Sequence, residues 1–248
     1  MPSFRLDSQV ALVTSASAGM GAAIAVACAE AGADVAVHEM TRAPDETCAR
    51  VRQAGRRAVP ITGDLADASE PARLVADVLG AFGRLDVVVC LACSPTTVDT
   101  SRLDATWDRL IAARLSSTFR LCRAFGRYLH ETGRRGRIVN VALPRDRHED
   151  CGFAACNGGI THMTRALARE WASSGIAVNV IVPGFLRAAA AKLDDAAALR
   201  GLDDAGGLAG NARLERDRRE ERSLDQLRLE RGRGNPQDRF LREDNLAF

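Results

Sequence analysis

The residues from Thr14 to Gly21 are mostly small and have the composition of a loop that holds a phosphate group. Gly19 and Gly21 let backbone N–H groups approach a pyrophosphate closely, and the positive N-terminus of a helix that follows directly adds to the attraction. Glu39 lies 18 residues after Gly21, at the end of the next apolar run, where a carboxylate can accept hydrogen bonds from a ribose diol. This pattern predicts a dinucleotide site that takes NAD in preference to NADP.

Cysteines and a histidine form a second set of side chains that could do chemistry. Cys90 and Cys93 make a C-x-x-C pair after an apolar run, and we expect Cys151, Cys156 and His148 across the same crevice. Thiolates and imidazole in such a group bind zinc or carry out redox chemistry. One C-x-x-C pair without a second paired spacing is weak evidence, however, and Cys90 is more simply explained as a small buried residue. We therefore predict reduced thiols and no metal site.

The elements that must position these residues alternate between short apolar runs and longer helical patterns. The expected strands are Val10 to Val13, Asp34 to His38, Ala58 to Thr62, Val87 to Leu91, Ile138 to Ala142 and Ala177 to Val182. The expected helices are Gly21 to Glu30, Ala43 to Gln53, Glu70 to Phe82, Trp107 to Tyr128 and Phe153 to Trp171. This order predicts an α/β fold with a doubly wound parallel sheet, of the Rossmann-like kind.

Composition limits the kind of partner. The 248 residues carry 34 basic and 32 acidic side chains, and a net charge of +2 does not favour nucleic acid or an anionic membrane. No apolar run reaches the 18 to 20 residues that a membrane span needs, and we expect a cytoplasmic protein with a small-molecule ligand. Residues 1–187 are expected to form the Rossmann-like domain. Residues 188–212 are rich in Ala, Gly and Asp and residues 213–248 in Arg and Glu, which predicts a charged, partly disordered lid or tail over residues 188–248.

Several motifs, in order and spacing, resemble the short-chain dehydrogenase/reductase family, in particular its 3-oxoacyl and polyketide ketoreductase branch. The motifs are the small-residue loop, Asp64 after the third strand, the strand from Leu85 to Val89, the strand from Gly136 to Val141, and Asn179 with Pro183 and Gly184. The resemblance runs from about Ser3 to Phe185. It implies cofactor contacts at Ser15, Ser17, Gly19, Met20, Gly21, Glu39, Asp64, Leu65, Ala92, Pro183 and Gly184.

The same resemblance implies four reacting side chains that this sequence lacks. In the family a tyrosine protonates a carbonyl while NAD(P)H gives a hydride, a lysine lowers the pKa of the tyrosine, a serine polarises the carbonyl and an asparagine supports a water relay. These positions are occupied here by Phe153, Asn157, Leu143 (or Ala142) and Arg114, respectively. The only tyrosine is Tyr128 and the only lysine is Lys192, so a shifted alignment does not restore the pair.

Three functions remain open at this point. The first is a pseudoenzyme that binds a dinucleotide or a polyketide-like ligand and acts as a scaffold, a sensor or a partner subunit. The second is a non-redox enzyme of the cyclase, dehydratase or aldolase type, with His148 as a candidate base and Arg114 opposite it. The third is an NAD(P)-dependent oxidoreductase with a rearranged proton donor. A charged loop around His148 is also explained by simple solvation, and a decaying gene would show similar losses.

The resemblance also implies an assembly. The two long helices would pack against their copies in a homodimer, or against an active family member in a hetero-oligomer. Apolar residues at helical spacing support burial of the first of these helices, from Leu110 to Phe125, whereas Arg114, Arg120, Arg123 and Arg127 would disturb the interface or give it paired charges. The chain ends at Phe248, before the family's last strand, so we expect that strand to be missing.

Overall fold

The computed structural model of the protein describes residues 5–91, 103–142 and 151–183, and it confirms a doubly wound parallel sheet. Its strands are β1 (Val10–Val13), β2 (Asp34–Glu39), β3 (Ala58–Thr62), β4 (Val87–Leu91), β5 (Gly136–Val141) and β6 (Ile176–Ile181). They are all parallel and lie in the order β3-β2-β1-β4-β5-β6. The order reverses between β1 and β4, and in such sheets ligands bind beyond the carboxyl ends of the strands at this point.

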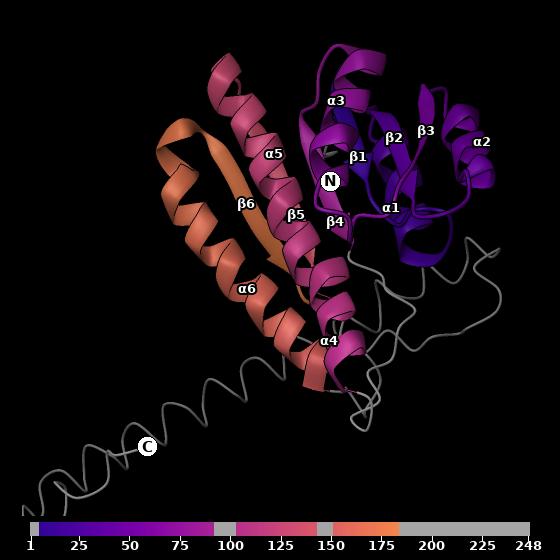
Figure 1. The fold of residues 1–248 in the computed structure, drawn as a ribbon. Coiled ribbons are helices and arrows are strands. Elements are labelled where there is room, and N and C mark those ends of the chain that lie inside the picture. The colour runs from indigo at the N-terminus through magenta and orange to yellow at the C-terminus, as the bar shows by residue number, and fades with distance from the viewer. Residues whose placement is uncertain (1–4, 92–102, 143–150, 184–248) are drawn as a thin grey trace, which may run out of the picture. The chain divides into compact units, whose positions relative to one another are not determined.

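Helices connect the strands. They are α1 (Gly19–Glu30), α2 (Asp45–Gln53), α3 (Glu70–Phe82), α4 (Leu103–Ile111), a π-helical turn η1 (Ala112–Ser116), α5 (Ser117–Thr132), α6 (Cys151–Trp171) and a short 3₁₀ turn η2 (Ala172–Ser174). Figure 1 shows α5 running between α3 and α6. Both α3 and α5 end at a glycine with a left-handed backbone, Gly83 and Gly133. None of the described helices is long and apolar enough to cross a membrane.

The core has two main layers, one on each side of the sheet. Leu12, Val88 and Ile138 point to the face covered by α3, α5 and α6, whereas Val13 and Val89 point to the face covered by α1 and α2. Successive residues of a strand point to opposite faces, so a sheet covered on both sides needs continuous apolar strands. All four residues of β1 and all five of β4 are buried, and these strands place the candidate site.

The structure differs from the sequence prediction mainly in the long helix. The predicted helix from Trp107 to Tyr128 extends from Leu103 to Thr132 and contains the π-helical turn η1. A π turn adds one residue to a helix, which is not visible in a 3.6-residue periodicity. Phe119, predicted on the apolar stripe, has an exposed fraction of 42%. The predicted tail and the absence of the last strand concern residues outside the described ranges, so both remain predictions.

Candidate functional site

The loop after β1 adopts the strained geometry that a close approach to phosphate requires. Ser15 has a φ of +50°, in the left-handed region that favours glycine, and Gly19 has a φ of +57°. The Ser15 hydroxyl donates a hydrogen bond to the carbonyl oxygen of Leu91, 3.1 Å away at the end of β4. This bond holds the loop beside the point where the strand order reverses.

Gly21 fixes how closely helix α1 approaches the loop. A Cβ atom at this position would lie 2.1 Å from the carbonyl oxygen of Ser15, far inside van der Waals contact. Only a glycine lets the first turn of α1 pack against the backbone of Ser15 and Ala16. The helix N-terminus therefore opens directly onto the loop, which is the arrangement that binds anions in nucleotide sites.

Two threonines support the loop, and sequence reasoning did not single out either as a site residue. The Thr14 hydroxyl donates to the carbonyl oxygen of Leu91 at 3.0 Å and accepts from the Leu91 N–H at 2.8 Å, so it joins β1 to β4. The Thr47 hydroxyl on α2 donates to the carbonyl oxygen of Ser17 at 3.2 Å. Thr14 could have been found from the sequence, because its hydroxyl stands at the buried end of an otherwise apolar strand.

Glu39 lies at the end of β2 and contacts the same loop. Its carboxylate accepts hydrogen bonds from the backbone N–H of Ser17 at 3.2 Å, from the Ser17 hydroxyl, and from the backbone N–H of Met40 at 2.8 Å. Burial opposes ionisation of Glu39, but these hydrogen bonds outweigh it and lower the pKa of the carboxyl. Glu39 is therefore a carboxylate at neutral pH.

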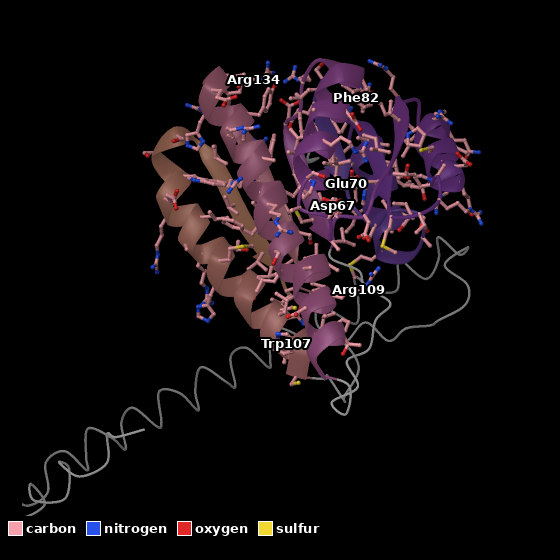
Figure 2. All side chains as sticks on the ribbon, viewed as in Figure 1. Asp67, Glu70, Phe82, Trp107, Arg109 and Arg134 are labelled. Atoms are coloured by element: carbon pink, nitrogen blue, oxygen red, sulfur yellow. The ribbon has the colours of Figure 1, made fainter. Side chains whose placement is uncertain are left out.

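The other residues predicted to contact the cofactor do not form a cluster like that of Ser15, Ser17 and Glu39. Asp64 accepts a hydrogen bond from the backbone N–H of Ala66 at 2.9 Å and lies 3.8 Å from the guanidinium of Arg109, which Figure 2 labels on α4. Leu65 and Met20 are half-buried against the two core layers, and Pro183 is half-buried after β6. Ala92 and Gly184 lie outside the described residues.

Three of the four positions that the resemblance assigns to the reaction come together in one contact. The guanidinium carbon of Arg114 lies 4.2 Å from the centre of the Phe153 ring. Nη2 of Arg114 donates to the amide oxygen of Asn157 at 3.2 Å. Arg114 has an exposed fraction of 1% and Phe153 of 4%, and Phe153 packs with Leu110 and Cys156. The fourth position, Leu143, and the candidate base His148 lie outside the described residues.

The π-helical turn η1 carries Arg114 and has its own support. The hydroxyl of Ser117 donates to the carbonyl oxygen of Ala113, and the hydroxyl of Thr118 donates to that of Arg114, both at 2.6 Å. In a π turn, carbonyl groups depart from the regular α-helical hydrogen-bond pattern, and these two hydroxyls donate hydrogen bonds to such carbonyl groups. Arg114 is buried, whereas Arg123 and Arg127 on the same long helix are exposed and Arg120 is half-buried.

The thiol hypothesis finds little support in the described part of the chain. Cys90 is buried in the layer under α5, as predicted, and a hydrogen bond with Cys122 together with burial raises the pKa of its thiol. Cys156 belongs to the separate group around Phe153, so it does not face Cys90. Across residues 5–91, 103–142 and 151–183, no three His, Cys, Asp or Glu side chains form a group that could hold a metal ion. Cys93 is outside these ranges.

Comparison with known proteins settles the family. Residues 9–197 match the family model for short chain dehydrogenases. The chain belongs to the short-chain dehydrogenase family. It is 32% identical to 2-dehydro-3-deoxy-D-gluconate 5-dehydrogenase of Dickeya dadantii over 187 residues, which cover 74% of each chain. It is also 32% identical to a 3-oxoacyl-[acyl-carrier-protein] reductase of Synechocystis over 188 residues, 73% of this chain and 75% of the relative.

A solved structure agrees with this assignment. The protein from Sinorhizobium meliloti 1021, assigned to the short-chain alcohol dehydrogenases, superimposes with a TM-score of 0.70 at 36% identity and covers 78% of each chain. The short-chain dehydrogenase family is a family of NAD(P)-dependent oxidoreductases that act on small molecules. The recognition made from sequence motifs is therefore confirmed at the level of family and fold.

Proposed function

We propose that this protein is a dinucleotide-binding member of the short-chain dehydrogenase family that does not carry out the family's tyrosine-dependent hydride transfer, and that it acts as a ligand-binding or partner subunit. The observation that carries this proposal is the contact of Arg114 with Phe153 and Asn157. These three side chains stand at the positions that the family resemblance assigns to the relay asparagine, the acid and its lysine.

The chemistry of the three side chains supports the loss of acid catalysis. A phenyl ring at Phe153 has no proton to donate, and the amide of Asn157 carries no charge that could lower a neighbour's pKa. Arg114 keeps its proton at any physiological pH, so it can bind an anion but cannot act as a general acid. Loss of a general acid alone reduces a rate by about 10² to 10⁴.

The nucleotide half of the site fits the cofactor. Gly21 lets the N-terminus of α1 pack directly against the backbone of the loop, where it can attract a pyrophosphate, and Glu39 is an ionised acceptor for a ribose diol. A carboxylate at this place repels the 2′-phosphate of NADP, which supports NAD as the preferred dinucleotide. NAD(H) would supply or accept a hydride when bound. The residues of this chain at the three described reaction positions would position a ligand but not exchange its proton.

The experiment that tests the proposal separates binding from turnover. Calorimetric titration of the purified protein is expected to give micromolar binding of NADH and at least tenfold weaker binding of NADPH. Oxidation of NADH with a panel of ketones is expected to stay at the level of the buffer. Turnover of a ketone by the wild-type protein would refute the loss of chemistry, and no heat with millimolar NADH would refute the nucleotide site.

A reversion series sharpens the same test. Phe153→Tyr alone restores the hydroxyl but leaves Arg114 and Asn157 in place, so we expect no turnover. The triple variant R114N/F153Y/N157K restores three of the four family side chains, and we expect ketone-dependent NADH oxidation about 10²-fold above the wild type. The third function considered above, a rearranged donor, predicts the opposite ranking, with the wild type faster.

The proposal includes assembly with another chain through the face formed by α4, α5 and α6. The sequence predicted either a second copy of this chain or an active family member as the partner.

A further inference from the structure

A histidine occupies a core position of β2 beside residues that are all apolar. Val35, Ala36 and Val37 are fully buried, and the next residue, His38, has an exposed fraction of 2%. A leucine could fill such a position without a polar atom that needs a hydrogen bond. A buried imidazole in this strand is therefore not explained by packing alone.

The imidazole makes one hydrogen bond within the described ranges, and it reaches the end of β3. Nε2 of His38 lies 3.0 Å from the carbonyl oxygen of Gly63. Because a carbonyl oxygen only accepts, the ring carries its proton on Nε2 and donates it to Gly63. Burial lowers the pKa of His38, so the ring is neutral at neutral pH. Nδ1 is buried and has no hydrogen-bond partner among the described residues.

The same residue connects the segments that carry the predicted nucleotide contacts. The backbone carbonyl oxygen of His38 accepts a hydrogen bond from the N–H of Ala16, 2.8 Å away in the loop after β1. Gly63, which the imidazole contacts, directly precedes Asp64, and its N–H donates to the carbonyl oxygen of Glu39 at 3.1 Å. His38 thus joins the phosphate loop and the end of β2 to the segment that presents Asp64.

A side chain of α3 holds the same segment from outside the core. Nη2 of Arg73 donates to the carbonyl oxygen of Thr62 at 2.7 Å, and Nε of Arg73 donates at 2.9 Å to Glu70, which Figure 2 labels. The side chain of Arg73 is 45% exposed, so water competes for these bonds. The bond from His38 is closed to water, and it is therefore the stronger constraint on the position of Gly63.

We propose that His38 is a positioning residue of the dinucleotide site and holds the segment of Gly63 and Asp64 in place for the adenosine half of the ligand. The inference rests on the proposed function, because it assigns a role within the same nucleotide site. The ring is too deeply buried to touch a ligand, so it acts through the backbone of Gly63. Without this bond, Asp64 and the carbonyl group of Glu39 lose a fixed distance from the core of β2.

Three substitutions separate the hydrogen bond from the packing. Glutamine places an amide N–H near the position of Nε2, asparagine places one near that of Nδ1, and leucine has no polar atom. We expect His38→Gln to bind NADH within about threefold of the wild type, and His38→Asn and His38→Leu to bind it at least about tenfold more weakly in calorimetric titration. Circular dichroism verifies folding, since the Kd of a fully folded variant does not depend on its free energy of unfolding.

ADP-ribose, which contains the adenosine half without the nicotinamide, locates the effect. We expect His38→Leu to weaken the binding of ADP-ribose and of NADH by the same factor. The matched control is His130→Leu, which removes an imidazole 2.6 Å from the carbonyl oxygen of Gly126 on α5 and should leave both affinities unchanged. Wild-type affinity in His38→Leu would overturn the proposal, as would a loss confined to NADH or a loss of the same size in His38→Gln.

Hydrogen exchange of the ligand-free protein tests the positioning without a nucleotide. The N–H of Gly63 is bonded to the carbonyl oxygen of Glu39, and the N–H of Ala66 to the carboxylate of Asp64. We expect both amides to exchange at least about fivefold faster in His38→Leu than in the wild type, and His38→Gln to restore the slower rate. Unchanged exchange in His38→Leu would refute the positioning role. A wild type that binds neither NADH nor ADP-ribose would instead refute the proposed function, and the exchange rates would still decide the role of His38.

Discussion

The guanidinium of Arg114 covers the ring of Phe153 at 4.2 Å, and the same group donates to Asn157. A cation held over an aromatic face and removed from water is stabilised by about 2 kcal/mol. The three side chains thus contact one another at three of the four positions that the family resemblance assigns to the reaction. Restoring one of them without the others should cost stability.

The pair formed by Arg114 and Asn157 gives a prediction that depends on this coupling. Asn157→Lys places an ammonium beside a buried guanidinium, so we expect it to reduce the free energy of unfolding by about 2 kcal/mol. In the background Arg114→Asn the same lysine has no like charge beside it, and we expect most of the loss to disappear. Urea denaturation of the two single variants and the double variant measures the cycle. Effects that add to within about 0.5 kcal/mol would contradict the coupling.

Ser15 provides a test of backbone strain in the loop. Its φ of +50° costs a non-glycine residue about 1 kcal/mol, and its hydroxyl bonds to the carbonyl oxygen of Leu91. Ser15→Ala and Ser15→Gly both remove that hydrogen bond, but only glycine also removes the strain. We expect Ser15→Gly to be about 1 kcal/mol more stable than Ser15→Ala in urea denaturation. Equal stability of the two variants would mean that the loop relaxes without the side chain.

The loop and the sheet could be predicted from the sequence because local patterns determine them. β1 and β4 are continuous apolar runs, and Gly19 and Gly21 stand at positions where geometry excludes a side chain or favours glycine. The contact between Glu39 and the loop follows from parallel neighbours β1 and β2, whose carboxyl ends meet at one edge. These relationships depend on a few residues that are close in sequence or in adjacent strands.

The burial of Arg114 and the exposure of Phe119 could not be predicted in this way. The extra residue of η1 rotates helix α5 about its axis by about 100°, so apolar residues on either side of η1 do not share one stripe. Arg114 is buried among tertiary partners that include Phe153 and Asn157, some 40 residues later, which supply a ring and an amide oxygen. A charge is expected at the surface unless such tertiary partners are known.

Glu39 should determine the choice of dinucleotide. Glu39→Ser removes the carboxylate that would accept hydrogen bonds from a ribose diol and that would repel a 2′-phosphate. We expect NADH to bind about tenfold more weakly and the preference over NADPH to be lost, as measured by calorimetry. Glu46→Ser on the exposed face of α2 is the matched control and should leave both affinities unchanged. An unaltered ratio of NADH to NADPH affinity in Glu39→Ser would exclude this role.

His38 should make the stability of the protein depend on pH. Its ring is 2% exposed and Nε2 lies 3.0 Å from the carbonyl oxygen of Gly63. Burial is the main cause that lowers the pKa of His38 below its usual value, and the charge of Arg73 adds to it. The hydrogen bond with Gly63 and the charges of Glu39 and Glu70 raise the pKa but do not outweigh burial. The unfolded chain therefore binds a proton near pH 6.5 that the folded protein does not yet bind.

The sign of the effect follows from this difference in bound protons. The contribution of neutral His38 to the free energy of unfolding is fully present above about pH 6.5. It is lost as the pH falls from there towards the lower folded pKa of His38, with a limiting slope of about 1.4 kcal/mol per pH unit. His38→Gln keeps a hydrogen-bond donor for Gly63 but does not titrate, so its free energy of unfolding should change much less between pH 5 and pH 7. His130→Gln replaces a histidine at the protein surface and is the matched control. Urea denaturation at a series of pH values decides the matter, since equal slopes for the wild type and His38→Gln would assign the pH dependence to other groups.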